Sequence, residues 1–350
     1  MRDFDIPLPV GRALLNPVFR VLLHHRLPFA MQRGLMDLGS RAQLLPDGVT
    51  MRRMRLAGRV TELHTAGDTA PTTAVLYLHG GGYAVGSLAT HRSLAARLAR
   101  DSRSAVYVLD YRMGPEHPFP AALDDATAAF RELVSRCGFR PDQITVAGDS
   151  AGGGLSLALA QRLIAEHGMR PAALGLIAPW TDPNAVSSRE RDLVVNGPWS
   201  RACAAAYLGA GDGADTGYAP LRGEMRGLPP TYVQVDVSEL LHEQCLELVA
   251  ALRAAGVEVH YTETEGLWHV AQMQAAWFAP AARVLGELAD FLRAAASPVA
   301  SATEETRRAR GDRAAGSLPR MGAPMRPDRA AECRTAEFSV VDDARRQKVS

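Results

Sequence analysis

Cysteine is scarce in this chain of 350 residues, which contains only four, widely spaced at positions 137, 203, 245 and 333. No two of them form a Cys-x-x-Cys pair, so the sequence indicates neither a disulfide framework nor a zinc site. We therefore expect buried free thiols, a reducing compartment and a cytoplasmic location.

Net charge and long apolar runs are also missing. The chain has 39 basic and 38 acidic side chains, so no excess of charge points to nucleic acid as a partner. Near the N-terminus, Arg12, Pro17 and Arg20 interrupt the apolar stretches before a signal-peptide core or a membrane span of about 20 residues is complete. We expect no stable membrane insertion and a partner that enters a pocket. The sequence does not decide whether the protein forms a homo-oligomer.

Changes in composition divide the chain into three parts. Residues 1–45 have helical periodicity and are expected to form an N-terminal cap, with Asn16-Pro17 predicted as a helix start. The apolar side chains of this segment fit ordinary packing better than a lid or a membrane contact. Residues 46–296 alternate strands and helices around an irregular insertion at about 180–228. Residues 297–350 have 11 basic and 8 acidic side chains and few large apolar ones, which predicts a disordered tail.

The alternation of strands and helices predicts an α/β fold. Strands separated by helices of this size form a mostly parallel central sheet with helices on both faces. Ligands of such sheets bind beyond the carboxyl ends of the strands. Candidate functional residues should therefore follow predicted strands directly.

Ser150 stands at such a position, in the sequence Val146-Ala-Gly-Asp-Ser-Ala-Gly-Gly153. A predicted buried strand precedes it and a predicted helix follows it. The small neighbouring residues would let the backbone turn sharply and expose the serine hydroxyl. The helix start would also direct backbone N–H groups and a positive dipole end at a developing oxyanion. The Gly-x-Ser-x-Gly pattern favours a nucleophile elbow over a plain strand–turn–helix corner.

Three consecutive glycines follow the predicted strand 74–78, in the sequence His79-Gly-Gly-Gly-Tyr83. Glycine loses more backbone entropy on folding than any other residue, so a run of three is costly for stability. We interpret the run as a backbone that lies close to a ligand with its N–H groups pointing inward. A flexible surface turn is the alternative.

A serine nucleophile needs a base, and the base needs an acid to orient it. His269 follows the last predicted strand, at the sheet edge where Ser150 is expected. The acid should lie between the serine and the histidine in the chain. Glu239 and Asp236 both follow the predicted strand 231–235. We favour Glu239, and Asp236, which could instead cap the next helix, is the alternative acid.

Other polar and aromatic residues have structural interpretations. The charges of Asp110, Arg112, Glu116 and His117 alternate in a proline-rich stretch, which is typical of an internally paired loop. In the irregular insertion, the aromatic side chains fit packing better than the walls of an acyl pocket; these are Trp180, Trp199 and Tyr207.

Four segments together resemble the hormone-sensitive-lipase family of esterases, also called bacterial family IV, over about residues 45–295. They are His79-Gly-Gly-Gly-Tyr83, Asp110-Tyr-Arg-Met-Gly-Pro-Glu-His-Pro-Phe-Pro-Ala-Ala-Leu-Asp-Asp125, Gly148-Asp-Ser-Ala-Gly-Gly153 and Gly266-Leu-Trp-His269. The resemblance implies an α/β-hydrolase fold and hydrolysis of carboxylic esters without a cofactor or metal.

The resemblance also implies roles by position. Ser150 would be the nucleophile and His269 the base, and Gly81, Gly82 and Ala151 would form the oxyanion hole. One segment departs from the family, whose usual acid is an aspartate before Pro-Leu. The matching stretch here is Ser238-Glu-Leu-Leu241, which puts Glu239 in that place.

The sequence therefore predicts a serine hydrolase that cleaves short- to medium-chain acyl esters through an acyl-enzyme. Its partner would be a small-molecule ester. An amidase or peptidase with the same triad is one alternative, because that triad also cleaves amides. A relative that binds ligands without catalysis is another, and the presence of both Ser150 and His269 argues against it.

Overall fold

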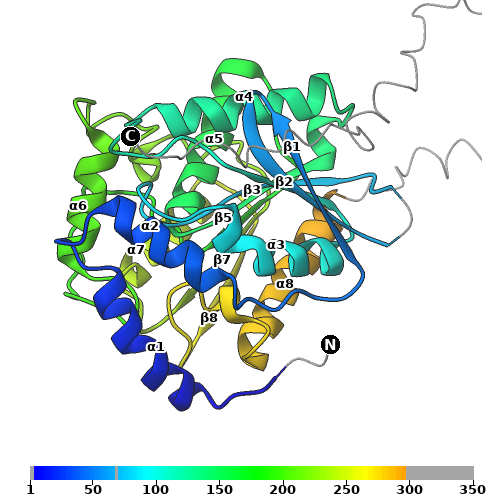
Figure 1. The fold of residues 1–350 in the computed structure, drawn as a ribbon. Helices are drawn as coiled ribbons and strands as arrows, with labels where there is room; N and C mark the ends of the chain where they lie inside the picture. Colours follow the sequence, from blue (N-terminus) through cyan, green and yellow to red (C-terminus); the bar gives the residue numbers. More distant parts are fainter. Residues whose placement is uncertain (1–3, 68–69, 297–350) are drawn as a thin grey trace, which may run out of the picture.

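A sheet of eight strands runs through the middle of the protein (Figure 1). The structure is a computed structural model and describes residues 4–67 and 70–296. The strands lie in the order β1-β2-β4-β3-β5-β6-β7-β8. Their bounds are Val49–Leu56 (β1), Arg59–Ala66 (β2), Ala74–Leu78 (β3), Ala105–Leu109 (β4), Ile144–Asp149 (β5), Leu174–Ile177 (β6), Thr231–Asp236 (β7) and Val259–Thr264 (β8). Strand β2 pairs antiparallel with β1 and β4, and the other neighbours are parallel, so the predicted α/β fold is confirmed.

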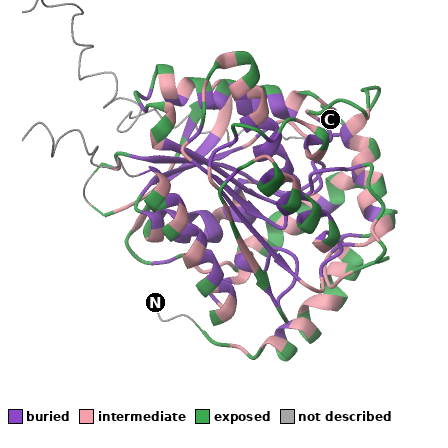
Figure 2. Ribbon diagram, turned by 180° about the vertical axis from the view of Figure 1, so that it is seen from behind, coloured by how far each residue is buried: buried purple, intermediate pink, exposed green. Residues whose placement is uncertain are grey.

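The central strands form the core of the protein. Every residue of β3, β4 and β5 is buried, which matches their nearly continuous apolar sequences. Figure 2 shows this buried layer, with exposed residues on the surrounding helices and loops. Strand β8, at one edge of the sheet, is only partly buried. The centre of the sheet is therefore a rigid support for the loops at its carboxyl ends.

Helices cover the sheet from both sides. Their bounds are Leu8–Leu22 (α1), Phe29–Ser40 (α2), Leu88–Ser102 (α3), Ala121–Ser135 (α4), Ser150–His167 (α5), Gly197–Leu208 (α6), His242–Ala254 (α7) and Ala279–Ala296 (α8), and short 3₁₀ helices span Pro141–Gln143, Pro220–Arg222 and Ala271–Gln274. Helices α3 and α8 contact each other on one side of the sheet, and α4 and α5 contact each other on the opposite side (Figure 1). Both faces are thus shielded from water.

Helices α1 and α2 are fixed to the sheet domain by arginine side chains. Arg12 donates hydrogen bonds to the carbonyl oxygens of Gly266 and Leu267, at 3.2 and 2.7 Å. Arg33 donates to the carbonyl oxygen of Ala84 at 2.8 Å and to both carboxylate oxygens of Glu116. The two helices are thereby held against the loops that follow β3, β4 and β8.

The predicted helix start at Asn16-Pro17 is wrong. Helix α1 begins at Leu8, after Pro7, and continues through Pro17 to Leu22. Pro7 and Pro9 already supply the fixed φ angles that suit a helix start. Pro17 costs the helix one backbone hydrogen bond, and the packing of α1 on the sheet domain overrides this loss.

The charged stretch after β4 is paired, but partly with residues outside it. Arg112 binds the carboxylate of Asp125 through Nε and Nη2, with a shortest distance of 2.8 Å. Glu116 pairs instead with Arg33 of α2, at 2.8 Å. The stretch therefore also anchors the N-terminal helices. The alternation of charges along the sequence predicted only pairing within the stretch.

The cysteines differ from one another. Cys203 and Cys245 are buried free thiols, as expected. Cys137 is disulfide-bonded, so the expectation of free thiols is wrong at this position. The predicted tail, 297–350, lies outside the residues that the structure describes.

Candidate active site

Ser150 lies at the junction of β5 and α5, on a sharply turned backbone. Its φ is +52°, in the left-handed region that residues with a side chain rarely adopt. Such strain persists only where the surrounding structure enforces it, and it often marks a functional site. A Cβ on Gly152 would lie 1.9 Å from the carbonyl oxygen of Leu78. Gly152, two positions after the serine, is therefore needed for the close approach of α5 to β3.

One cavity brings Ser150 and His269 together. It has a volume of about 90 Å³, and both residues are among those lining it. His269 is buried, and Ser150 is only 9% exposed. No hydrogen bond joins these two side chains among the contacts of the described residues. A substrate carbonyl entering the cavity would meet both.

The ring of His269 is held by Glu239. The Nδ1 atom of His269 lies 2.6 Å from Oε2 of Glu239, and both side chains are buried. The other carboxylate oxygen, Oε1, accepts a hydrogen bond from the backbone N–H of Asp236 at 2.8 Å. Both oxygens of Glu239 therefore have partners, which fixes the carboxylate and through it the orientation of the imidazole.

The electrostatics of this pair favour an imidazole that takes up a proton. Burial alone would lower the pKa of His269, but the hydrogen bond and the negative charge of Glu239 outweigh burial and raise it. Burial raises the pKa of Glu239, and the hydrogen bond to His269 offsets part of this rise. The pair can thus hold a proton on His269 during a reaction.

Asp236 has different partners from those expected of an acid that orients His269. Its Oδ1 atom accepts hydrogen bonds from the backbone N–H and the hydroxyl of Ser238, at 3.0 and 2.7 Å. Its Oδ2 atom accepts from the hydroxyl of Thr264 at 3.0 Å and from the N–H of Leu267 at 2.8 Å. Asp236 therefore joins the end of β7 to the loop that carries His269.

The glycine triplet borders the same cavity. Gly80 and Gly81 line it together with Ser150, whereas Gly82 and Ala151 are not among its lining residues. Gly81 has a φ of +117°, and a Cβ there would lie 2.1 Å from the carbonyl oxygen of Val85. Only glycine can hold this backbone without displacement.

A buried network behind the triplet was missed by the sequence analysis. Asp149 accepts hydrogen bonds from the N–H of Gly80 at 3.0 Å and from the hydroxyl of Tyr77 at 2.8 Å. Its second oxygen lies 3.3 Å from Nε2 of His91. Burial would raise the pKa of Asp149, but the charge of His91 and these hydrogen bonds lower it overall. Asp149 therefore stays ionised and fixes the first glycine beside the nucleophile.

His79 and His91 contribute to this network in different ways. Burial and the neighbouring His91 lower the pKa of His79 to about 4, so its ring is neutral near pH 7. Its Nδ1 atom lies 2.9 Å from the carbonyl oxygen of Gly80. His91 also lines the cavity. The only local signal for the network was the position of Asp149 in the elbow, since His91 comes from a separate helix.

The insertion supplies part of the cavity wall. Trp199 lines it and donates a hydrogen bond from its indole to Gln32 of α2 at 2.9 Å. Tyr207 packs instead against Tyr83, with ring centroids 3.6 Å apart, and Trp180 is not among the lining residues. The preference for packing thus suits Tyr207 and Trp180 but not Trp199.

Across residues 4–67 and 70–296, no three His, Cys, Asp or Glu side chains are grouped so that they could hold a metal ion. Within the same residues, no helix is both long and apolar enough to cross a membrane.

Comparison with known proteins assigns the chain to a family. A model of the α/β-hydrolase fold matches residues 75–273. The chain is 39% identical to an acetyl-hydrolase of Streptomyces hygroscopicus over 201 residues, which cover 56% of this chain and 67% of the relative. It is 33% identical to an esterase of Acinetobacter venetianus over 257 residues, which cover 71% of this chain and 84% of the relative.

Solved structures agree with these matches. An esterase from the bacterial hormone-sensitive lipase family superposes with a TM-score of 0.76 at 32% identity, and the match covers 81% of this chain and 98% of that one. A hormone-sensitive lipase from a metagenome library superposes with a TM-score of 0.79 at 30% identity, covering 84% of this chain and all of that one. The chain therefore belongs to the hormone-sensitive-lipase family of α/β-hydrolase esterases.

Proposed function

We propose that this carboxylic ester hydrolase works through a Ser150–His269–Glu239 triad and an acyl-enzyme. The observation that carries the proposal is the buried 2.6 Å contact of Glu239 with His269, which lines the same cavity as Ser150. Glu239 stands where the family usually has an aspartate. Its longer side chain still brings one oxygen to Nδ1 of His269, while Nε2 is free to act on the serine.

The reaction has two matching halves. His269 takes the proton of Ser150 as its oxygen attacks the ester carbonyl, and it then gives that proton to the departing alcohol. Water next attacks the acyl-enzyme by the same route and releases the acid. In both halves the amides of Gly81, Gly82 and Ala151 stabilise the oxyanion. The placement of Gly81 beside Ser150 in the cavity wall supports this assignment.

The substrate is a small-molecule ester, and we propose that its acyl chain is short to medium. The 39% identity to an acetyl-hydrolase supports the short end of this range.

We also propose which parts of the chain form the cap over the active site. Residues 1–45 and the insertion at about 180–228 act as a cap on the hydrolase domain, 46–296. This proposal is supported by the cavity wall, which takes Phe19 and Met36 from the first part and Trp199 from the second.

Hydrolysis of a p-nitrophenyl butyrate solution tests the proposal. Ser150→Ala should abolish turnover and labelling by a serine-directed phosphonate, because no nucleophile remains. Ser156→Ala, in the same helix, is the matched control and should keep both. Wild-type turnover by Ser150→Ala would overturn the proposal. A series of esters from acetate to palmitate, with matched amides, then tests the acyl-chain and ester preferences.

We also propose that the protein is cytoplasmic and binds no nucleic acid. The free thiols of Cys203 and Cys245 support a cytoplasmic location, and the disulfide of Cys137 opposes it. Fractionation of cells that make the full chain decides between them. The balanced charge supports the absence of a nucleic-acid partner. Sedimentation of the purified protein tests for a homo-oligomer.

A further inference from the structure

Exposed apolar side chains are concentrated at the N-terminal end of the protein. Of twelve large apolar side chains that are exposed within the described residues, nine lie between residues 4 and 45. They are Phe4, Val10, Leu14, Val18, Val21, Met31, Leu35, Leu38 and Leu45. Single exposed apolar residues are common, but a concentration of this kind marks an interaction surface.

Most of these residues form one stripe on each N-terminal helix. A helix turns by about 100° per residue, so Val10, Leu14, Val18 and Val21 fall within an arc of about 80° on α1. Met31, Leu35 and Leu38 fall within a similar arc on α2. We call these seven residues the outer stripe. Leu14 is 64% exposed and Val21 is 70% exposed, so the protein's own core does not cover it.

The same helices are also apolar on the inner side. Phe19, Leu23 and Met36 line the catalytic cavity from α1, its C-terminal end and α2. Gly11 of α1 lies against Phe278, where even a Cβ would clash at 2.4 Å. A helix that is apolar on opposite sides needs an apolar environment on both. The sheet domain is the apolar environment of the inner side, and the outer stripe needs another apolar partner.

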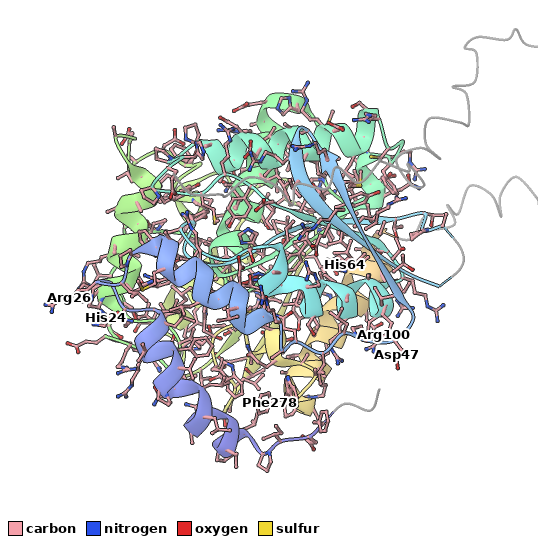
Figure 3. The ribbon with its side chains drawn as sticks, viewed as in Figure 1. His24, Arg26, Asp47, His64, Arg100 and Phe278 are labelled. Carbon is pink, nitrogen blue, oxygen red and sulfur yellow. The ribbon has the colours of Figure 1, made fainter. Side chains whose placement is uncertain are left out.

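The charge around the outer stripe selects its partner. Two of the five arginines in residues 4–45, Arg12 and Arg33, bond to the sheet domain. The exposed charged residues of this segment are Arg20, Arg26 and Arg41 on the basic side and Asp5 and Asp37 on the acidic side. Beyond the C-terminal end of α1, His24, His25 and Arg26 are all exposed, and Figure 3 shows His24 and Arg26 at the outer edge of the molecule. A second copy would bring basic groups against basic groups, whereas anionic lipid headgroups complement them.

We propose that the outer stripe docks this protein on the surface of a bilayer that contains anionic phospholipid. Helices α1 and α2 lie in the interface with their outer side chains among the acyl chains and their basic residues among the headgroups. The catalytic cavity lies under the docked helices. This contact is peripheral, and it does not depend on the identity of the catalytic triad.

Sedimentation with vesicles tests the docking. The full-length Ser150→Ala protein is mixed with vesicles of phosphatidylcholine alone or with phosphatidylglycerol added. We expect binding to the anionic vesicles. Changing Val10, Val18 and Val21 together to threonine keeps their shape but adds hydroxyls, and it should weaken binding about tenfold or more. Val186→Thr, at a position 84% exposed outside the N-terminal helices, is the matched control and should bind like the parent.

Charge is tested by a second variant. Arg26→Gln should weaken binding about fivefold on anionic vesicles and leave binding to neutral vesicles unchanged. The triple threonine variant made with Ser150 intact should hydrolyse dissolved p-nitrophenyl acetate at the wild-type rate. The hydrolysis assay and the vesicle assay therefore measure catalysis and docking independently.

Several results would overturn the proposal. One is the absence of binding to anionic vesicles, and another is equal binding by the parent and both variants. Formation of a dimer without lipid, abolished by the triple substitution, would assign the outer stripe to a second copy instead.

Discussion

Glu239 and His269 form a buried pair in which Oε2 of the carboxylate lies 2.6 Å from Nδ1 of the imidazole. The two residues come from separate loops, one after β7 and one after β8, and adjacent parallel strands bring them together. Because Glu239 raises the pKa of His269, the pair sets the pH below which the base becomes protonated and inactive.

The first prediction concerns Glu239→Gln. Removing the negative charge removes the main cause of the raised pKa of His269, and the burial that remains lowers it. The acidic limb of kcat/KM against pH should therefore move to lower pH. At the same time kcat should fall about 10³- to 10⁴-fold, because the imidazolium formed in the reaction loses its counter-charge. A pH series of initial rates with p-nitrophenyl acetate measures both changes.

The matched control is Glu243→Gln. Glu243 lies near Glu239 in the chain but is exposed and bonded to Ser188. This variant should keep the wild-type rate and pH profile. If Glu239→Gln behaves in the same way, Glu239 is not the triad acid.

The second prediction separates Asp236 from Glu239. Asp236→Asn replaces a carboxylate that accepts four hydrogen bonds by an amide that accepts on one side only. We expect a loss of about 2 kcal/mol in the free energy of unfolding, measured with urea. The fall in kcat should be smaller than for Glu239→Gln, and the acidic limb should stay in place. A larger fall for Asp236→Asn would reverse the assignment.

Local sequence signals carried much of the fold and site. The alternation of short apolar strands with helices was enough to predict a mostly parallel sheet, since parallel strands buried on both faces have nearly continuous apolar sequences. Ser150 could be predicted as the nucleophile because a nucleophile elbow is encoded by adjacent small residues. His269 could be predicted as the base because its strand ends at the same sheet edge, and the structure places both residues in the wall of one cavity. In each case the determining residues are neighbours in the chain.

Features that depend on residues far apart in the chain could not be predicted from the sequence. Nothing near Glu116 indicates that its partner is Arg33, 83 positions earlier. Likewise, His91 belongs to α3 and meets Asp149, at the end of β5, only in the folded protein. The start of α1 was misplaced for a related reason, since Pro17 breaks an isolated helix but tertiary packing overrides that tendency.

The third prediction concerns the backbone at Gly81. Gly81→Ala places a methyl group 2.1 Å from the carbonyl oxygen of Val85 at a φ of +117°, so the backbone must move. If its amide stabilises the oxyanion, kcat should fall about 10²- to 10³-fold with little change in KM. Steady-state kinetics with p-nitrophenyl butyrate measure the two constants separately.

Gly34→Ala is the control for this variant. Gly34 lies in α2, and a Cβ there would meet nothing within 4 Å. Alanine suits a helix better than glycine, so the protein should be as active as the wild type and equally or slightly more stable. Full activity of Gly81→Ala would remove Gly81 from the oxyanion hole.

The last prediction concerns stability away from the site. Glu62 of β2 is fully buried and accepts hydrogen bonds from Arg92 at 2.5 and 3.0 Å and from Arg53 at 3.2 Å. Burial would raise the pKa of Glu62, but the neighbouring His64, whose Nε2 lies 3.7 Å away, the hydrogen bonds of Arg92 and Arg53 and the charge of Arg92 lower it from 4.5 to about 2. A depressed pKa of this size corresponds to about 3 kcal/mol of stability.

The sign of the pH dependence follows from the direction of this shift. The stabilisation by Glu62 is complete above the unfolded pKa of 4.5 and is lost as the pH falls toward about 2. Glu62→Gln should therefore unfold at lower urea concentration than the wild type at neutral pH, and the difference should shrink as the pH is lowered below 4.5. Glu166→Gln removes an exposed glutamate 3.8 Å from Arg162 and should change stability by less than about 1 kcal/mol. A constant difference between Glu62→Gln and wild type across the pH series would show that the carboxylate charge does not stabilise the fold, because only an ionised Glu62 gains from its arginine partners.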